Sequence, residues 1–248
     1  MTRAKHIPRV YLDRVLNVGD TVSLPDDKRH HLTTVLRLGA GAALVLFNDS
    51  VYEYDARLIE ADRKRATLEV LAVDRPVRES SLSITLIQAV ARGDRMDFAL
   101  AKAVELGVTA IQPVLTERGQ VKLDGARLSK KQAHWQRVVE SAAEQSGRLI
   151  CPPLAETIGS ATLLSRSLPA ESNFMLAPGA ARRLSALTPA LDAALWVGPE
   201  SGLSAAEIDR ASAAGWQALA LGPRVLRTET AGMAALAALQ TAWGDLGG

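Results

Sequence analysis

Alternating apolar and polar positions dominate the first part of the chain and predict short β-strands. These strands are expected at residues 21–24, 43–47, 51–59 and 66–73. Asn48-Asp49-Ser50 separates two of them and indicates a hairpin turn. Between the early strands, residues 27–38 carry apolar side chains at helical spacing. Short strands with one helix in about seventy residues predict a small barrel.

A polar segment with a proline, residues 75–81, ends this strand-rich pattern. Because such segments commonly join domains, we place the domain boundary after residue 74. Further strands are expected at residues 82–90, 110–115, 174–176, 193–197 and 216–221. Helices are expected at residues 94–106, 130–146 and 230–243, with another beginning at Ser204. Strands that alternate with helices predict an α/β domain with a mainly parallel, helix-covered sheet.

Polar residues and glycines mark the ends of these helices. Asp94 is the expected N-cap of the first helix, and Gly107 is expected to end it. Ser204 and Glu207 have the spacing of a capping box, which predicts that a helix begins there.

Two loops near the C-terminus carry the strongest functional signal. Residues 195–204 and 219–231 each begin as an apolar run, pass through Gly-Pro and lead into a predicted helix. Open α/β sheets present ligand-binding loops in this way at the carboxyl ends of their strands. Neither Gly-x-Gly-x-x-Gly nor the phosphate-binding Gly-x-x-x-x-Gly-Lys-Ser/Thr occurs in the chain. The loops therefore predict a site for a nucleotide-like ligand that is built on a different plan.

Composition limits the class of protein and the compartment in which it is expected to work. The 248 residues are 48% apolar and 23% charged, which is ordinary for a globular protein. A single cysteine excludes an internal disulfide framework, residues 1–8 lack the apolar core of a signal peptide, and no apolar run reaches the length of a membrane span. We therefore expect a cytoplasmic protein with no membrane partner.

Charge is distributed unevenly although its net value is only +2. Lys and Arg exceed Asp and Glu in residues 1–37 and 81–150, whereas residues 151–248 are slightly acidic. Local basic surfaces fit a nucleic-acid partner. Solvated faces with no partner explain the same charges equally well, so charge alone leaves both interpretations open.

Several short stretches, taken together, point to one family. They are Arg9-Val10-Tyr11, His30 to Leu38, Gln88-Ala89, Arg92 to Asp97, Lys102 to Val108, Glu117-Arg118, Trp135 to Arg137, Glu140 to Arg148, Gly198-Pro199-Glu200 and Leu226 to Ala231. In this order and spacing the chain resembles the 16S ribosomal RNA uridine-N3 methyltransferases (the RsmE family) of the SPOUT superfamily.

The resemblance implies a PUA-like, RNA-binding β-barrel at residues 1–74 and a SPOUT methyltransferase domain at residues 75–248. The second domain would contain a C-terminal trefoil knot that holds S-adenosylmethionine. The implied reaction methylates N3 of one uridine in 16S rRNA, within the assembled small ribosomal subunit, and the implied assembly is a homodimer. One departure is visible, since Ser201 and Leu203 stand where the family usually has glycine and phenylalanine. A serine can restrict a turn that the family builds with glycine, whereas Leu203 keeps the apolar character, and we interpret the two replacements as tolerated variation.

The resemblance also assigns a cofactor site. Its expected residues are Leu176, Gly198, Pro199, Glu200, Gly202, Leu221, Gly222, Leu226, Thr228 and Thr230. The glycines allow close approach of the backbone to the ligand, and the leucines can wall an adenine base. From spacing alone, core leucines and helix-ending glycines explain the same residues. No metal is expected, because the cofactor itself carries the activated methyl group.

Catalysis at uracil N3 requires loss of a proton and precise alignment. Arg227 is expected to stabilise the uracil oxygens, and Glu200 or Glu229 to accept the proton or hold Arg227. Alternatively, Glu229 stabilises a helix N-terminus, and Thr228 and Thr230 only cap the last helix. The expected RNA-binding residues are Arg3, Arg9, Lys28, Arg29, Arg37, Arg92, Arg95, Arg118 and Arg148.

Other functions remain as alternatives to rRNA methylation. A methyltransferase of another RNA, such as tRNA, is the nearest one, and a non-catalytic RNA-binding assembly factor is the second. The intact cofactor loops argue against the assembly factor, since a pure binder does not need them. A NAD-dependent dehydrogenase is disfavoured by the missing Gly-x-Gly-x-x-Gly.

Overall fold

The computed structural model describes residues 7–62, 64–121, 124–167 and 170–247. The chain divides into two compact units. The first contains Met1–Glu79 with Ala143–Cys151, and the second contains Ser80–Ala142 with Pro152–Gly248. The short return segment Ala143–Cys151 thus groups with the first unit, although it follows a long stretch of the second. The domain limits 1–74 and 75–248 stay a prediction.

The first unit is built on one five-stranded sheet in the order β1-β3-β4-β5-β2. Its strands are β1 (Arg9–Tyr11), β2 (Thr21–Ser23), β3 (Ala43–Phe47), β4 (Glu53–Ala61) and β5 (Ala66–Asp74). β1 pairs with β3 in parallel, and the other neighbours in the sheet are antiparallel. Alternate residues of the strands, such as Tyr54, Ala56 and Leu58 of β4, enter a common apolar core. The four strands expected from the alternating pattern are confirmed, and β1 was not expected because it is only three residues long.

The helical segment of the first unit is shorter than the pattern predicted. It consists of α1 (Asp26–His30) and a π-helical turn, η1 (His31–Val35). Arg37 has a φ of 54°, which a right-handed helix cannot accommodate, so the expected helix over residues 27–38 ends before that residue.

The second unit contains a six-stranded sheet in the order β11-β9-β10-β6-β7-β8. Its strands are β6 (Ser83–Ala89), β7 (Ala110–Leu115), β8 (Ile158–Gly159), β9 (Ser172–Leu176), β10 (Asp192–Val197) and β11 (Gln217–Leu219). Every pairing in it is parallel, which confirms the predicted α/β architecture. The helices are α2 (Asp94–Glu105), α3 (Gly125–Ser146), α4 (Ser160–Leu164), α5 (Ala205–Ala213) and α6 (Thr228–Trp243), with a 3-10 turn, η2 (Leu184–Ala186).

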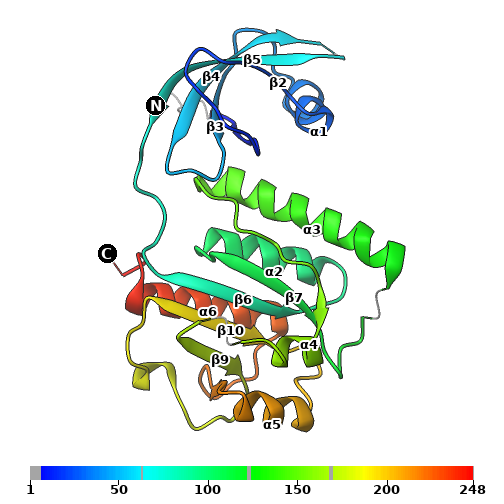
Figure 1. The fold of residues 1–248 in the computed structure, drawn as a ribbon, viewed down its shortest axis with the longest axis vertical. Coiled ribbons are helices and arrows are strands. Elements are labelled where there is room, and N and C mark those ends of the chain that lie inside the picture. Colours follow the sequence, from blue (N-terminus) through cyan, green and yellow to red (C-terminus); the bar gives the residue numbers. More distant parts are fainter. Residues whose placement is uncertain (1–6, 63, 122–123, 168–169, 248) are drawn as a thin grey trace. The chain divides into compact units, whose positions relative to one another are not determined.

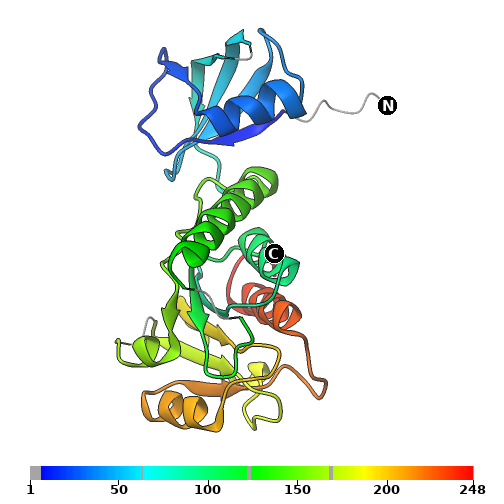
Figure 2. The same ribbon diagram turned by 90° about the vertical axis from the view of Figure 1, so that its right-hand side faces the viewer.

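Helices cover both faces of this parallel sheet (Figures 1 and 2). Ile87 and Trp196 belong to the core cluster beneath α4 and α5. Their neighbours Gln88 and Val197 face the other way and lie close to Gly232 of α6. α2 packs beside α6 on that same side. Because side chains alternate along a strand, the two faces of β6 and β10 carry separate sets of contacts.

Two helix starts test the predicted caps. The capping box is confirmed, because the Ser204 hydroxyl accepts the Glu207 N–H and the Glu207 carboxylate accepts the Ser204 N–H. Asp94 is not an N-cap but the first residue of α2, and Gly93 occupies the cap position with a φ of 56°. Glycine adopts this left-handed backbone without the strain that aspartate would have.

The other two long helices begin earlier than their apolar stripes indicated. α3 begins at Gly125 rather than Lys130, and α6 begins at Thr228 rather than Thr230. Arg227 is the N-cap of α6 and makes no side-chain cap hydrogen bond. In the part of the chain that the structure describes, no helix combines the length and apolar character that crossing a membrane requires.

Candidate functional site

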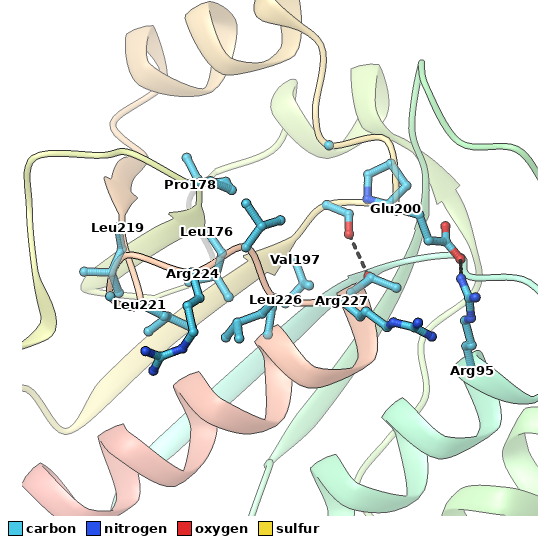
Figure 3. A pocket seen from close by; sticks show the side chains of 18 residues that line it. Arg95, Leu176, Pro178, Val197, Glu200, Leu219, Leu221, Arg224, Leu226 and Arg227 are labelled. Carbon is cyan, nitrogen blue, oxygen red and sulfur yellow. Dashed lines mark hydrogen bonds and ion pairs between the residues drawn. The ribbon is translucent and has the colours of Figure 1, made fainter.

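A pocket of about 370 Å³ opens at the carboxyl ends of β9, β10 and β11 (Figure 3). The segments that follow these three strands line it, together with the first turn of α6 and one side chain from α2. In parallel sheets this edge is where loops from several strands converge on a ligand. The two Gly-Pro loops singled out in the sequence therefore meet in one cavity.

Leucines form the apolar wall of the pocket. Leu176 is the last residue of β9, and Leu221 and Leu226 lie in the loop between β11 and α6. Figure 3 places Leu226 between Leu221 and Val197 along this wall. All three leucines that the sequence predicted for the base therefore line the pocket.

Glycines expose backbone along the pocket. A Cβ at Gly198 would lie 3.2 Å from both Cγ and the backbone nitrogen of Leu203, so a side chain there would force Leu203 to shift. Gly202 and Gly222 have φ values of 72° and 82°, and a Cβ at either would meet no atom within 4 Å. These positions require glycine for their left-handed backbone rather than for space.

The loop between Gly198 and Leu203 explains how Ser201 is tolerated. The Gly202 N–H donates to the Pro199 carbonyl at 2.8 Å and closes a tight turn. The left-handed residue of this turn is Gly202, and Ser201 is not among the described residues with positive φ. The Ser201 hydroxyl instead donates to the Arg118 carbonyl at 2.6 Å. Ser201 therefore does not restrict the turn, in agreement with a tolerated replacement, and its side chain anchors the loop.

A charged cluster forms one end of the pocket. Arg95 of α2 and Glu200, which follows β10, form an ion pair in which nitrogen and oxygen are 3.0 Å apart. Figure 3 shows Arg227 extending toward this pair from the start of α6. Glu200 thus pairs with Arg95 rather than holding Arg227, a contact that no sequence pattern predicted. Arg95 itself was expected to bind RNA and proves to line the pocket as well.

The opposite end of the pocket carries a cation that the sequence interpretation missed. Arg224 lies beside Leu219 and Leu221 in Figure 3 and is exposed. Next to it, Val225 lines the pocket while it is 80% exposed. Both residues lie in the loop that contains Gly222-Pro223, so the glycine-proline signal located the segment but not these side chains.

The first turn of α6 separates residues that reach the pocket from those that do not. Thr228 lines it and donates its hydroxyl to the Gly198 carbonyl at 2.7 Å. Thr228 is therefore not the N-cap that the alternative interpretation assigned. Glu229 and Thr230 are not among the lining residues. Within the described residues, Oε2 of Glu229 is buried and has no hydrogen-bond partner.

The predicted RNA-binding residues of the first unit are mostly engaged in internal contacts. Arg9 pairs with Glu53 at 2.5 Å, Lys28 with Glu144 at 2.7 Å, and Arg29 with Asp26 at 3.1 Å. The Arg148 side chain is 7% exposed and lies 2.6 Å from Glu79. Arg37 is exposed, and Arg3 lies outside the described residues.

Three predicted RNA-binding residues belong to the second unit. Arg92 precedes α2, Arg118 follows β7, and both side chains are exposed. Arg95 is the only one of the three that lines the pocket. Among the described residues, no group of three or more His, Cys, Asp or Glu side chains is arranged to hold a metal ion.

Comparison with protein families gives two matches that together span most of the chain. Residues 78–240 match the model of an RNA methyltransferase domain. Residues 24–71 match the model of an RNA methyltransferase PUA domain. The pocket lies within the first match, and the five-stranded sheet overlaps the second.

Relatives and solved structures resemble the chain along nearly its whole length. It is 31% identical to Ribosomal RNA small subunit methyltransferase E of Buchnera aphidicola subsp. Schizaphis graminum, over 98% of this chain and 99% of that one. A crystal structure of Ribosomal RNA small subunit methyltransferase E from Neisseria gonorrhoeae with S-adenosyl methionine is 45% identical, with a TM-score of 0.89 over 97% of this chain and 99% of that one. A Legionella pneumophila protein solved with the cofactor SAM is 35% identical, with a TM-score of 0.94 over 98% of this chain and 100% of that one.

Proposed function

Because the chain belongs to the family of Ribosomal RNA small subunit methyltransferase E, we propose that it transfers a methyl group from S-adenosylmethionine to N3 of a uridine in 16S rRNA. The observation that carries the proposal is the pocket at the ends of β9, β10 and β11, which joins an apolar wall to a charged end. The similar Neisseria and Legionella structures contain S-adenosylmethionine, which supports the cofactor.

The pocket residues fit this cofactor. Leu176, Leu221 and Leu226 offer apolar contacts to an adenine ring. Gly202 and Gly222 leave the adjacent backbone uncovered, because no side chain projects from it. Adenosine needs both features, since its ring is flat and apolar while its edges form hydrogen bonds. S-adenosylmethionine supplies a methyl group that is already activated on a sulfonium, so the residues of the chain need only bind, orient and handle a proton.

Arg227 and Glu200 are the residues we assign to the uracil. N3 becomes nucleophilic only when its proton leaves, and the negative charge then spreads onto the neighbouring carbonyl oxygens. The Arg227 guanidinium has a fixed fork of donors that suits those oxygens. We assign Glu200, at the same end of the pocket, to take the N3 proton once Arg95 releases its carboxylate; the ion pair of Glu200 with Arg95 at this end supports the assignment. Glu229 is the second candidate for the base, but it does not line the pocket, and its buried Oε2, which has no hydrogen-bond partner among the described residues, would have to turn toward the uracil.

The RNA must present an unpaired uridine. N3 lies on the Watson–Crick edge, so pairing hides it, and the base has to leave its stack before it reaches the pocket. Arg92, Arg95, Arg118 and Arg224 are exposed or line the pocket and are proposed to contact the RNA backbone there. In the first unit, Arg37 is exposed and is assigned the same role.

A knotted C-terminus is part of the proposal. β11 pairs with β9 on one side, and on the other side Ala220 donates its N–H to the Arg182 carbonyl at 3.0 Å. Residue 182 lies in the connection from β9 to β10. The last strand therefore lies between β9 and the segment that leaves β9, and this arrangement supports threading of the chain through that connection.

We also propose a homodimer that acts on the assembled small subunit in the cytoplasm. α6 is rich in alanine, and several of its apolar residues remain partly exposed. Phe98 of α2, which is 46% exposed, adds apolar surface on the helix that packs beside α6. A second copy of the chain would cover such a surface.

Methyl transfer from labelled S-adenosylmethionine to small ribosomal subunits that lack the modification tests the proposal. We expect N3-methyluridine in the 16S rRNA, identified by nucleoside analysis, and its loss in Arg227→Ala. Arg210→Ala, which removes an exposed arginine outside the pocket, is the control and should retain activity. Methylation of a different RNA would overturn the proposed substrate. Absence of both cofactor binding and transfer would contradict the enzyme and favour an RNA-binding assembly factor.

A further inference from the structure

Gln88 is a fully buried amide at the carboxyl end of β6, next to the strand that leads into the pocket. Its exposed fraction is 0%, and it pairs in register with Val197 of β10. Gln88 does not line the pocket. Its side chain faces α6, where a Cβ on Gly232 would lie 3.5 Å from the Gln88 Oε1. A polar side chain in this position requires an explanation, because its neighbours Leu86 and Val197 are apolar.

The amide begins a directed chain of hydrogen bonds that ends at the pocket. Gln88 Nε2 donates to Thr228 Oγ1 at 3.0 Å, and the Thr228 hydroxyl donates to the Gly198 carbonyl at 2.7 Å. Because the threonine oxygen receives a hydrogen from Gln88, its own hydrogen is directed toward Gly198. The chain thus links β6, the start of α6 and the loop after β10.

The orientation of the amide is fixed by a second bond. Nε2 also donates to the Ala89 carbonyl at 3.0 Å, and a rotated amide would place Oε1 against that carbonyl oxygen. In the orientation that is adopted, Oε1 is buried and has no hydrogen-bond partner among the described residues. An unpaired buried acceptor opposes folding. A contribution to folding stability therefore does not explain why glutamine stands here. The explanation must lie in Thr228, which the Gln88 amide holds in place.

We propose that Gln88 is a positioning residue for methyl transfer: through Thr228 it fixes the Gly198–Gly202 loop relative to the N-terminus of α6. This inference rests on the proposed function, because that loop carries Glu200 and the start of α6 carries Arg227. The separation of these two side chains depends on where the Gly198 carbonyl is held. Pro199 has no N–H, so this residue can donate no backbone hydrogen bond that would replace the lost anchor.

Gln88→Met tests the inference, because methionine keeps the length of the side chain and removes both the donors and the unpaired acceptor. We expect cofactor affinity, measured by titration calorimetry, and kcat for methyl transfer to fall about tenfold or more. The KM for the ribosomal subunit should stay within about twofold, and the unfolding midpoint should not fall. A structural role alone would lower the unfolding midpoint and leave cofactor affinity and kcat unchanged.

Variants of Thr228 test whether the effect passes through this residue. Thr228→Val removes the hydroxyl and should match the loss in Gln88→Met, whereas Thr228→Ser should restore most of the affinity. The double variant Gln88→Met/Thr228→Val should bind the cofactor no more weakly than either single variant, because the effects of residues in one series of hydrogen bonds are not additive. Additive losses of cofactor affinity would contradict a role of Gln88 that passes through Thr228.

Gln112 on the adjacent strand β7 is a matched control. Its Nε2 also donates to the carbonyl of the following residue, Pro113, at 2.9 Å, and to the Glu156 carbonyl at 2.7 Å, and it does not line the pocket. Gln112→Met should leave cofactor affinity and kcat unchanged. If the unmodified protein binds no cofactor, the proposed function fails. If it binds and Gln88→Met binds equally well and transfers equally fast, only the present inference is overturned.

Discussion

Arg95 of α2 and Glu200 of the loop after β10 join two distant segments of the chain at the charged end of the pocket. Their charged atoms are 3.0 Å apart, and their side chains are 44% and 20% exposed. The Glu200 carboxylate therefore has a cationic partner that is itself accessible from solvent. Under the proposed function, we expect a phosphate that competes for Arg95 to release Glu200 toward the uracil, and RNA binding would then be coupled to proton transfer.

Arg95→Ala should weaken RNA binding far more than it lowers the stability of the fold. An exposed ion pair contributes at most about 1 kcal/mol to the free energy of unfolding, so the unfolding midpoint should change little. Loss of one phosphate contact should weaken RNA binding and make the slope of log affinity against log salt shallower by about 0.7–0.9. RNA binding measured at several salt concentrations checks this. Arg210→Ala, which breaks another exposed pair, should leave the slope unchanged, and an unchanged slope in Arg95→Ala would refute the phosphate contact.

Gly222→Ala should impair the pocket through the backbone. Gly222 has a φ of 82°, and a Cβ there would meet no atom within 4 Å, so alanine is strained only by its conformation. We expect the loop to shift and cofactor affinity to fall, with a cost on the order of 1–2 kcal/mol. Gly41→Ala in the first unit is the matched control, since Gly41 has a φ of 89° and equally open surroundings. Titration calorimetry should show normal cofactor affinity for Gly41→Ala; equal affinities in both variants would contradict the assigned role of Gly222.

Most strands of the second unit were predictable because they are short apolar runs that end close to a glycine, a proline or a polar residue. β6, β7 and β10 follow that pattern closely. α4 and β8 were not predicted, because they are five and two residues long and such short elements show no recognisable hydrophobic periodicity. The return of Ala143–Cys151 to the first unit depends on contacts such as the bond from Cys151 N–H to Asp49, which no local pattern encodes.

The pocket was located from the sequence, whereas its charge contacts were not. Gly198 and Gly222 are recognisable because a backbone requirement selects glycine locally. The pairing of Arg95 with Glu200 joins residues far apart in the chain, and many arginines compete as equivalent partners in the sequence. Gln88 belongs to one of the stretches that carry the family resemblance, but the sequence indicates no role for it. Its partner Thr228 becomes known only from the packing of β6 against α6.

Gly232→Ala should stabilise the protein. Glycine inside a helix costs about 1 kcal/mol relative to alanine, and a Cβ at Gly232 would meet Gln88, Val197 and Leu86 at 3.5, 3.6 and 3.8 Å, which are ordinary contact distances. Urea denaturation should show a gain of about 0.5–1 kcal/mol. Gly107→Ala should show the opposite, because Gly107 has a φ of 80° and its Cβ would lie 2.6 Å from Gln240 Nε2. A loss of stability in Gly232→Ala would show that α6 cannot accept the added methyl group.

Glu117→Gln should change the acid limb of the stability profile. The Ser204 hydroxyl and, next, the Arg210 guanidinium lower the pKa of Glu117 below its ordinary 4.5. A lowered folded-state pKa stabilises the protein above pH 4.5, and this contribution is lost as pH falls through the folded-state value. The unfolding midpoint of Glu117→Gln should therefore lie below that of the unmodified protein at neutral pH, and the gap should close in acid. A gap that is constant with pH would contradict the shift.

Arg148→Ala should destabilise the first unit rather than act on RNA directly. The Arg148 side chain is 7% exposed, and its Nε and Nη2 donate to one oxygen of Glu79 at 3.0 and 2.6 Å. The other Glu79 oxygen accepts the Leu149 N–H at 2.8 Å, so the pair also anchors the return segment. The Glu79 side chain is 23% exposed and keeps the Leu149 N–H, so removal of Arg148 should cost less than the loss of a fully buried charge pair, about 1–3 kcal/mol.

Urea denaturation of Arg148→Ala and Arg92→Ala separates the two kinds of arginine. Arg92 is exposed, so its loss should change the free energy of unfolding by no more than about 0.5 kcal/mol while weakening RNA binding. Glu79→Ala should be at least as unstable as Arg148→Ala, because it breaks the same ion pair and also removes the acceptor of the Leu149 N–H. The opposite result would be an unchanged free energy of unfolding for Arg148→Ala together with a reduced salt dependence of RNA binding. It would mean that Arg148 exchanges Glu79 for a phosphate when RNA binds, and that the RNA-contact role expected from the sequence is correct.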